Sequence, residues 1–312
     1  MKILIVCSYR NYSVHTNFVA PFIYDQVISL EKKGCEVQYL FVKGGGITAY
    51  FRGYFNLIHT VKKWKPDIVH AHGGLCGFIS NLQRLIPVIC TYHGSDINLR
   101  FNRYISQFSI YFSTYNIFVS QKLIDLAKPK KNYSLIPCGV DLELFYPIND
   151  KKACRFKLNL NAEKKYVLFS KMFYDPVKNY PLAKQAIDKL LNVELLEFVG
   201  YTREETCFLM NACDAVLMTS FSEGSPQFIK EAMACNCPIV SVDVGDVKNL
   251  INETKGCFIT TYDPTSVAEN LQSALEFKNK TNGRIKILKF DNVKITNYII
   301  DIYIAVINNL MK

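Results

Sequence analysis

The stretch from Asp214 to Asp246 decides the fold class of this chain, and it reads DAVLMTSFSEGSPQFIKEAMACNCPIVSVDVGD. Its apolar run at 215–219 predicts a buried strand, residues 226–235 have the apolar spacing of a helix, and 238–242 predicts a second strand. A helix that joins two strands of one sheet implies that the strands are parallel. The stretch therefore predicts a βαβ unit, with a glycine-containing loop before the helix.

The beginning of this helix has the features of an anion-binding site. Ser225 is a good N-cap residue, and Pro226 suits the first helical position. The backbone N–H groups of Gln227 and Phe228 would then point out of the helix, where they can bind a phosphate.

Two carboxylates flank this helix start. Glu223 lies on the loop before the helix, and Glu231 lies four residues after Gln227, on the same helical face. Carboxylates repel a phosphate, but they bind pairs of hydroxyl groups well. We therefore expect the amides to bind a pyrophosphate, one carboxylate to bind sugar hydroxyls and the other to bind ribose hydroxyls.

The alternation of strands and helices extends outward from this segment in both directions. Predicted strands lie at 2–8, 36–42, 67–71, 88–92, 117–120, 166–170, 195–199, 215–219 and 238–242. Predicted helices include 18–33, 50–63, 180–191, 203–212, 226–235, 264–277 and 293–310. Repeated strand–helix units imply an α/β fold, in which helices cover both faces of parallel sheets.

The stretch 128–150 interrupts this alternation with three prolines and a basic run, so we place a domain boundary near its end. The 312 residues suffice for two domains, at 1–148 and 149–312. Two doubly wound domains in tandem are expected to face a central cleft with the carboxyl ends of their strands, where such sheets bind ligands. The last helix, at about 293–312, is expected to pack back on the N-terminal domain.

Composition and charge narrow the classes of function. A hydrophobic fraction of 49% and a charged fraction of 21% exclude a disordered chain. The formal net charge is +10, and residues 1–150 contribute +7 of it, from 16 basic and 9 acidic residues. This excess suggests an anionic partner and leaves nucleic acid, a membrane surface and phosphorylated substrates open.

The number and spacing of the cysteines and the hydropathy of the chain indicate the cellular compartment of the protein. The eleven cysteines are odd in number, scattered and without a C-x-x-C pair, so we interpret them as reduced. The longest uncharged stretch, 104–121, contains several Ser, Thr, Asn and Gln residues, so a membrane span is not expected. These observations predict a cytoplasmic protein, with peripheral association at the inner face of the membrane left open.

The spacing Glu223-x7-Glu231 within SEGSPQFIKEAMACNCPIV resembles the E-x7-E signature of the family 4 retaining glycosyltransferases, which have the GT-B fold. Other segments recur in the family's order along most of the chain: PDIVHAH at 66–72, TYHGSD at 91–96, VS at 119–120, IPCGVD at 136–141 and PVKN at 176–179. The resemblance is closest to bacterial enzymes that build capsular polysaccharide, exopolysaccharide or lipopolysaccharide. It implies two Rossmann-like domains and transfer of a hexose, with retention and without a metal, from a nucleoside-diphosphate sugar to a hydroxyl of a glycan or lipid-linked glycan. The expected donor is a UDP-sugar rather than a GDP-sugar.

The resemblance also implies roles for individual residues. Glu223 would contact the hydroxyls of the donor sugar, Glu231 would hold the nucleotide ribose, and Lys178 would neutralise the pyrophosphate. His93 would reach the reacting sugar, so His93, Glu223 and Lys178 form the expected catalytic set. Further donor contacts are expected from Asn179, Gly224, Ser225, Pro226 and Gln227, and acceptor-side or orienting contacts from Gly94 and Asp96.

Two positions depart from the family pattern. Many members have a Gly-Gly loop after the first strand, but residues 8–15 read SYRNYSVH, which leaves the donor contact at this loop open. Many members also have an Arg shortly before the Lys that corresponds to Lys178. Lys171 is the candidate for this second pyrophosphate cation, and a surface role for it stays open.

All five histidines lie between residues 15 and 93, which raises the question of a metal site. His70 and His72 would share one face of a strand, and His93 ends the neighbouring strand. No cysteine or carboxylate completes a metal-ligand spacing, and no Asp-x-Asp motif is present. We therefore expect no metal and no cofactor besides the nucleotide-sugar co-substrate, with His70 and His72 structural or lining the cleft.

Two rival functions remain. A sugar-nucleotide epimerase of the same two-domain fold would bind a similar donor without needing an acceptor. A basic, non-enzymatic nucleic-acid-binding protein would need clustered Lys and Arg with stacking aromatic residues, and the sequence contains no recognisable module of this kind.

Overall fold

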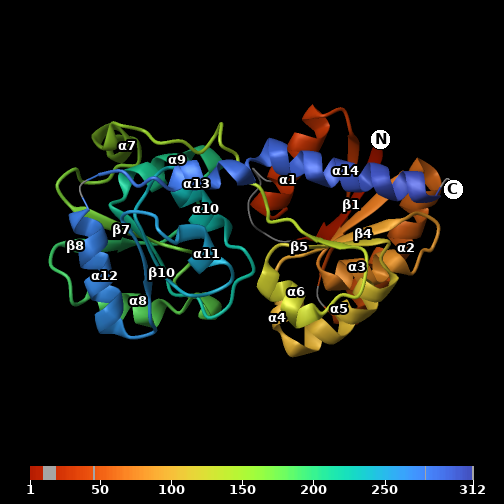
Figure 1. The fold of residues 1–312 in the computed structure, drawn as a ribbon, viewed down its shortest axis with the longest axis horizontal. Helices are drawn as coiled ribbons and strands as arrows, with labels where there is room; N and C mark the ends of the chain where they lie inside the picture. The colour runs from red at the N-terminus through yellow and green to blue at the C-terminus, as the bar shows by residue number, and fades with distance from the viewer. Residues whose placement is uncertain (10–18, 45, 278, 311–312) are drawn as a thin grey trace. The chain divides into compact units, whose positions relative to one another are not determined.

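The computed structural model describes residues 1–9, 19–44, 46–277 and 279–310, and the chain divides into two compact units (Figure 1). The first unit comprises Met1–Gly139 and Asn292–Lys312, and the second comprises Val140–Asp291. The division lies earlier in the chain than the expected boundary after residue 148. The reason is that Val140, Leu142 and Phe145 are buried in the core of the second unit.

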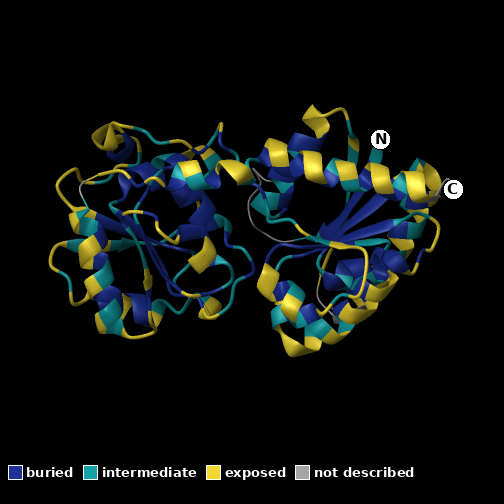
Figure 2. Cartoon of the chain, viewed as in Figure 1, coloured by how far each residue is buried: buried dark blue, intermediate teal, exposed yellow. Residues whose placement is uncertain are grey.

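The first unit is built on a parallel sheet of six strands in the order β2-β1-β3-β4-β5-β6. Its strands are β1 (Lys2–Ser8), β2 (Glu36–Val42), β3 (Ile68–His72), β4 (Val88–Tyr92), β5 (Tyr115–Phe118) and β6 (Tyr133–Leu135). The residues of β3 and β4 are all buried, as expected for strands that helices cover on both faces (Figure 2).

Helices cover both faces of this sheet. On one face, α1 (Pro21–Lys32) packs against the last helix, α14 (Asn292–Leu310). On the other face, α2 (Gly46–Trp64), α3 (Gly74–Asn81) and α5 (Arg100–Phe112) pack side by side (Figure 1). The shorter helices α4 (Ser95–Asn98) and α6 (Gln121–Ala127) lie near α5. The last helix thus belongs to the N-terminal unit.

The second unit contains a parallel sheet of five strands in the order β11-β10-β9-β7-β8. Its strands are β7 (Lys165–Phe169), β8 (Val193–Leu196), β9 (Ala215–Met218), β10 (Ile239–Val242) and β11 (Cys257–Thr260). This is a doubly wound order, in which the chain reverses direction across the sheet between β7 and β9. Ligands of such sheets bind beyond the carboxyl ends of the two strands at that point.

Two groups of helices enclose the second sheet. On one face, α8 (Tyr180–Ile187) packs against α12 (Pro264–Glu276). On the other face, α10 (Gln227–Ala234) contacts α9 (Arg203–Ala212), α11 (Val247–Ile251) and α13 (Gly283–Ile287) (Figure 1). The remaining elements are α7 (Lys151–Lys157) and the short 3₁₀ turns η2 (Pro176–Lys178) and η3 (Leu288–Phe290).

The sequence pattern misses two strands of the sheets. β6 and β11 are edge strands that are only partly buried, so neither has the continuous apolar run of an interior strand. Among the described helices, none combines the length and apolarity that a membrane span requires.

Candidate functional site

The loops after β7 and β9 meet at the point where the order of the second sheet reverses. The loop after β7 contains the η2 turn and ends at Asn179, whose backbone adopts the left-handed conformation (φ 55°) before α8 begins. Thr219, immediately after β9, donates from its hydroxyl to the carbonyls of Lys178 (2.8 Å) and Asn179 (3.1 Å). The end of β9 therefore fixes the turn that carries Lys178.

Lys178 and Glu223 form an ion pair at this place. The Lys178 Nζ lies 2.5 Å from the Glu223 Oε1, and both side chains are partly buried. The pair joins the loop after β7 to the loop after β9. The structure thus brings together two residues that the sequence predicts as parts of one site, although 45 positions separate them in the chain.

Glu231 lies on α10, and its buried carboxylate is paired with an arginine. The Arg203 Nη1 lies 2.5 Å from the Glu231 Oε1, and the guanidinium carbon of Arg203 lies 4.8 Å from the centre of the Phe145 ring. Sequence reasoning missed Arg203. A signal for it exists, because a carboxylate on the inner part of a helix needs a cation, and Arg203 opens a helix with a capping box from Thr202 to Glu205.

The expected cap of α10 is wrong. Pro226, not Ser225, is the N-cap residue, and the helix begins at Gln227. Pro226 keeps an extended backbone (ψ 120°), and the Ser225 hydroxyl donates to Asp246 Oδ2 at 2.6 Å instead of capping the helix. Burial raises the pKa of the Asp246 carboxyl above its usual value, and the nearby Lys230 ammonium offsets part of this rise.

The loop after β10 packs closely against the Glu223–Gly224 turn. Gly245 has a φ of +61°, and a Cβ at this position would lie 2.7 Å from the Gly224 carbonyl oxygen. A side chain here would therefore displace the turn that carries Glu223. This contact explains a glycine that the sequence pattern does not assign to the site.

Lys171 lies at the beginning of the same loop as Lys178. Its Nζ pairs with Asp175 Oδ2 at 3.2 Å, and Asp175 also accepts from the backbone N–H of Val177 at 3.0 Å. Lys171 is thus linked to the η2 turn through Asp175. Its proposed contact with the pyrophosphate stays a prediction.

The predicted histidines of the first unit form a connected group. His72 Nδ1 lies 2.9 Å from His93 Nε2, and the two rings are stacked. His70 is held by the Tyr303 hydroxyl at 2.5 Å and the Thr91 hydroxyl at 2.7 Å. Burial lowers the pKa of His72 to about 3, so His72 is neutral at physiological pH.

Asp96 fixes the backbone beside His93. Its carboxylate accepts from the backbone N–H groups of His93 (3.1 Å) and Gly94 (2.8 Å), and Gly94 has a φ of 143°. Burial raises the pKa of the Asp96 carboxyl. The geometry therefore gives Asp96 a role in positioning the 93–94 turn. The loop after β1, which departs from the family pattern, lies at residues 10–15 outside the described residues.

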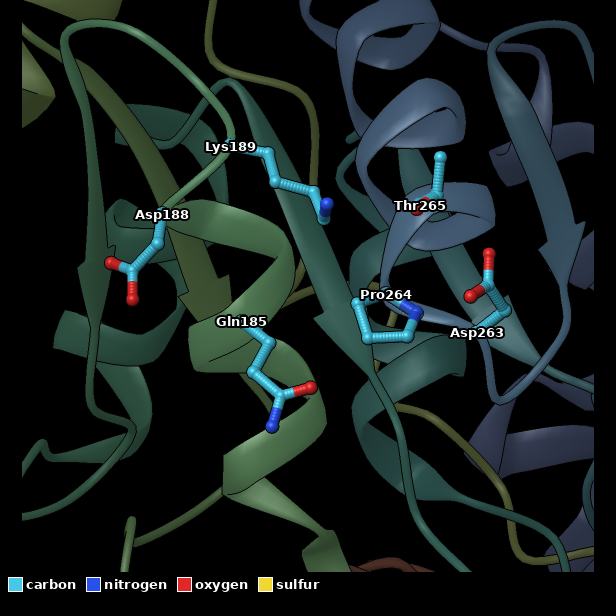
Figure 3. A pocket seen from close by; sticks show the side chains of 6 residues that line it. All are labelled: Gln185, Asp188, Lys189, Asp263, Pro264 and Thr265. Atoms are coloured by element: carbon cyan, nitrogen blue, oxygen red, sulfur yellow. The ribbon is translucent and has the colours of Figure 1, made fainter.

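Among the described residues, no metal-binding cluster is found at this site, and a hollow of the second unit lies elsewhere. Within the described ranges, no group of three or more His, Cys, Asp or Glu side chains could hold a metal ion. A hollow lies between α8 and α12 (Figure 3), and none of the predicted site residues lines it. Its volume is about 420 Å³. Its lining residues are Gln185, Asp188, Lys189, Asp263, Pro264 and Thr265.

Comparisons with known families match both halves of the chain. Residues 19–144 match the family model described as Glycosyltransferase Family 4, and residues 169–276 match the one described as Glycosyl transferases group 1. Together these matches span most of both units.

Two curated bacterial proteins are similar in sequence. One is a putative teichuronic acid biosynthesis glycosyltransferase of Bacillus subtilis, 25% identical over 65% of this chain and 60% of its own length. The other is an N,N'-diacetylbacillosaminyl-diphospho-undecaprenol alpha-1,3-N-acetylgalactosaminyltransferase of Campylobacter jejuni, 26% identical over 55% of this chain and 54% of its own length. The chain thus spans between half and two thirds of the length of these two relatives.

Solved structures share the fold over nearly the whole chain. A sucrose-phosphate synthase of Thermosynechococcus elongatus has a TM-score of 0.81 and 16% identity, and covers 99% of both chains. Anabaena Alr3699/HepE in complex with UDP has a TM-score of 0.77 and 17% identity, over 98% of this chain and 100% of its own. A UDP-GlcNAc 2-epimerase of Methanocaldococcus jannaschii is less similar, with a TM-score of 0.63 and 15% identity over 98% of this chain and all of its own. These likenesses establish the GT-B fold.

Proposed function

The chain belongs to the family 4 and group 1 glycosyltransferases, and from this premise we propose that it moves a sugar from a nucleoside-diphosphate donor to a hydroxyl of a glycan or lipid-linked glycan. The observation that carries the proposal is the pair of cation–carboxylate contacts, Lys178–Glu223 and Arg203–Glu231, at the carboxyl edge of the second sheet. The two bacterial relatives support a role in the synthesis of a surface polysaccharide.

The two ion pairs suggest how the donor is accommodated. The backbone of Lys178 is fixed in the η2 turn by Thr219, its ammonium contacts Glu223, and on donor binding the ammonium exchanges the Glu223 carboxylate for the pyrophosphate. Glu223 is then available to accept hydrogen bonds from the hydroxyls of the transferred sugar. Glu231, on the buried face of α10, accepts from the ribose hydroxyls while Arg203 keeps its charge balanced.

The chemistry assigned to this site is electrostatic. As the sugar leaves, negative charge develops on the β-phosphate, and the Lys178 ammonium and the amides at the start of α10 stabilise it. We propose that the transfer retains the anomeric configuration, as the family resemblance implies, and that the departing phosphate assists the incoming hydroxyl. The anomeric coupling constants in the NMR spectrum of the product test this: inversion would contradict the assignment.

We expect catalysis without a divalent cation, because a lysine and helix amides take the role that a metal has in other transferases. Incubation with EDTA should leave the rate of UDP release within about twofold of the untreated rate. A loss of activity that added Mg²⁺ or Mn²⁺ restores would show that a metal takes part.

The base of the donor is proposed to be uracil, which agrees with the UDP complexes of the structural neighbour from Anabaena. A saturating amount of UDP should raise the melting temperature by about 5–10 °C, because a ligand at a hundred times its Kd adds about 2.7 kcal/mol of stability. GDP and ADP at the same concentration are the controls and should shift it less. A larger shift with GDP would contradict the choice of base.

The epimerase remains the second candidate, since a 2-epimerase shares the fold. The two activities differ in their need for an acceptor. Incubation with the UDP-sugar alone should leave the donor sugar unchanged, and addition of a glycan acceptor should release UDP. An isomerised nucleotide sugar formed without acceptor would favour the epimerase.

A further inference from the structure

The solvent-exposed face of α5 is aromatic, whereas an ordinary surface helix exposes polar and charged residues. Phe101, Tyr104, Phe108 and Tyr111 follow one another at intervals of three or four residues, so they form one stripe along the helix. Their exposed fractions are 74%, 61%, 57% and 75%, and Phe112 beside them is 45% exposed. We call these five side chains the aromatic face.

The side of α5 that faces α3 carries small polar residues, and Ile110 is the buried apolar residue of this helix. Ser106, Ser109 and Ser113 are buried and face α3, which presents Gly74, Gly77 and Asn81 at the same spacing. A Cβ at Gly74 would lie 1.8 Å from the Ser106 hydroxyl oxygen, and one at Gly77 would lie 2.1 Å from that of Ser109. The two helices therefore approach each other closely through glycine and serine at these positions, and the Phe108 ring also makes an edge contact with Phe78 of α3, with the ring centres 6.4 Å apart.

Hydrogen bonds fix the rotation of α5 about its axis. The Ser106 hydroxyl donates to the Asp96 carbonyl at 2.9 Å, and the Tyr92 hydroxyl donates to Ser109 Oγ at 3.0 Å. The Asn81 amide donates to Ser113 Oγ at 2.9 Å. The exposure of the aromatic face is thus built into the packing of the first unit. A contiguous exposed apolar patch of this kind marks an interaction surface for a protein, a membrane or a ligand.

The charges around the aromatic face are positive. Between residues 67 and 125 the sequence contains four basic residues and three acidic ones, of which Asp96 is buried and Asp67 and Asp125 lie at the ends of the interval. A cation lies at each end of the face: Arg100 is the first residue of α5, and the Arg84 guanidinium lies 5.1 Å from the centre of the Phe112 ring. Leu82 and Leu85, also exposed, flank Arg84 in the chain.

We propose that the aromatic face docks on an anionic phospholipid surface. Tyr and Phe side chains are suited to the boundary between headgroups and acyl chains, and the two arginines complement the negative charge of the leaflet. A second copy of the chain fits less well, because a two-fold pairing of this face would bring Arg84 and Arg100 of both copies together without a neutralising carboxylate. The proposal does not depend on the identity of the donor.

Co-sedimentation of the full chain with vesicles tests the proposal. One set of vesicles contains phosphatidylcholine alone, and the other contains equal parts of phosphatidylcholine and phosphatidylglycerol. The chain should bind the second set and bind the first at least about tenfold more weakly, and added salt should weaken the binding. Equal binding to both sets, or none to either, would overturn the proposal.

Matched variants locate the surface. The double variant Phe108→Ser/Tyr111→Ser should reduce vesicle binding at least about tenfold, and Arg100→Glu at least about fivefold. The control Phe156→Ser/Leu191→Ser changes side chains that are 84% and 89% exposed in the second unit, and it should bind as the unaltered chain does. All variants should keep the same UDP-induced shift in melting temperature. Vesicle binding that the α5 variants leave unchanged would refute the assignment, as would a dimer in solution that these variants dissociate.

Discussion

Lys178→Ala should lower kcat/KM for the donor by about 10²–10³, the loss typical when one preorganised charge-stabilising group is removed. The reason is the position of this lysine: the Thr219 hydroxyl at the end of β9 donates to its backbone carbonyl, and its ammonium already contacts one carboxylate of the expected site. The effect should concern the phosphates specifically. The variant should lose affinity for UDP by calorimetric titration while its weak affinity for uridine stays the same.

A matched lysine in the same unit provides the control for this variant. Lys164 forms an exposed ion pair with Glu194 at 2.9 Å. It precedes β7 in the chain, whereas Lys178 follows this strand. Lys164→Ala should leave both the rate and the affinity for UDP unaltered, because an exposed pair contributes little. Full activity of Lys178→Ala would refute the site, and equal losses in both variants would indicate a general effect of charge.

Glu231→Ala should weaken UDP binding by about tenfold to a hundredfold, because a buried carboxylate that accepts from ribose hydroxyls makes charged hydrogen bonds of about 1.5–3 kcal/mol each. The fold should stay intact, since the Arg203 side chain left behind is partly exposed and reaches water. Titration with UDP and with 2′,3′-dideoxy-UDP measures the effect. The unaltered chain should discriminate strongly between the two ligands, and the variant should not.

The variant Arg203→Ala distinguishes two roles of Glu231: contact with the ribose hydroxyls, and neutralisation of the Arg203 charge. If Glu231 acts only as the partner of Arg203, the single variants and the double variant should all lose the same small amount of affinity. If Glu231 contacts the ribose, Arg203→Ala keeps the discrimination against dideoxy-UDP and Glu231→Ala loses it. Discrimination that persists in Glu231→Ala would contradict the assignment of this carboxylate.

Much of the fold could be predicted from the sequence because most of its strands contain a short apolar run. β1, β2 and β4 begin and end at the predicted residues, as does α9. The edge strands β6 and β11 could not be predicted, because they have only three and four residues and are only partly buried, whereas the edge strand β2 has seven residues and ends in the apolar run YLFV. The beginning of α10 was predicted one residue early, because Asp246, 21 positions away, accepts from the Ser225 hydroxyl that local preference assigns to the cap.

Site residues could be predicted from the sequence only where they lie in segments that resemble the family. Lys178 and Glu223 lie in segments that resemble the family, and the structure brings them into contact. Arg203 lies outside those segments, and its contact with Glu231 depends on how α9 packs beside α10, which no local pattern encodes. The contact between His72 and His93, by contrast, follows from the pairing of β3 with β4, and the sequence already predicts that these histidines lie on neighbouring strands.

A crystal structure of the chain with bound UDP tests the central claim most directly. We predict that the diphosphate lies within hydrogen-bonding distance of the Lys178 ammonium and of the first amides of α10, and that the ribose hydroxyls donate to Glu231. The Lys178–Glu223 contact should then be broken or shared with the diphosphate. A nucleotide bound in the hollow between α8 and α12, with the Lys178–Glu223 pair unchanged, would contradict the account.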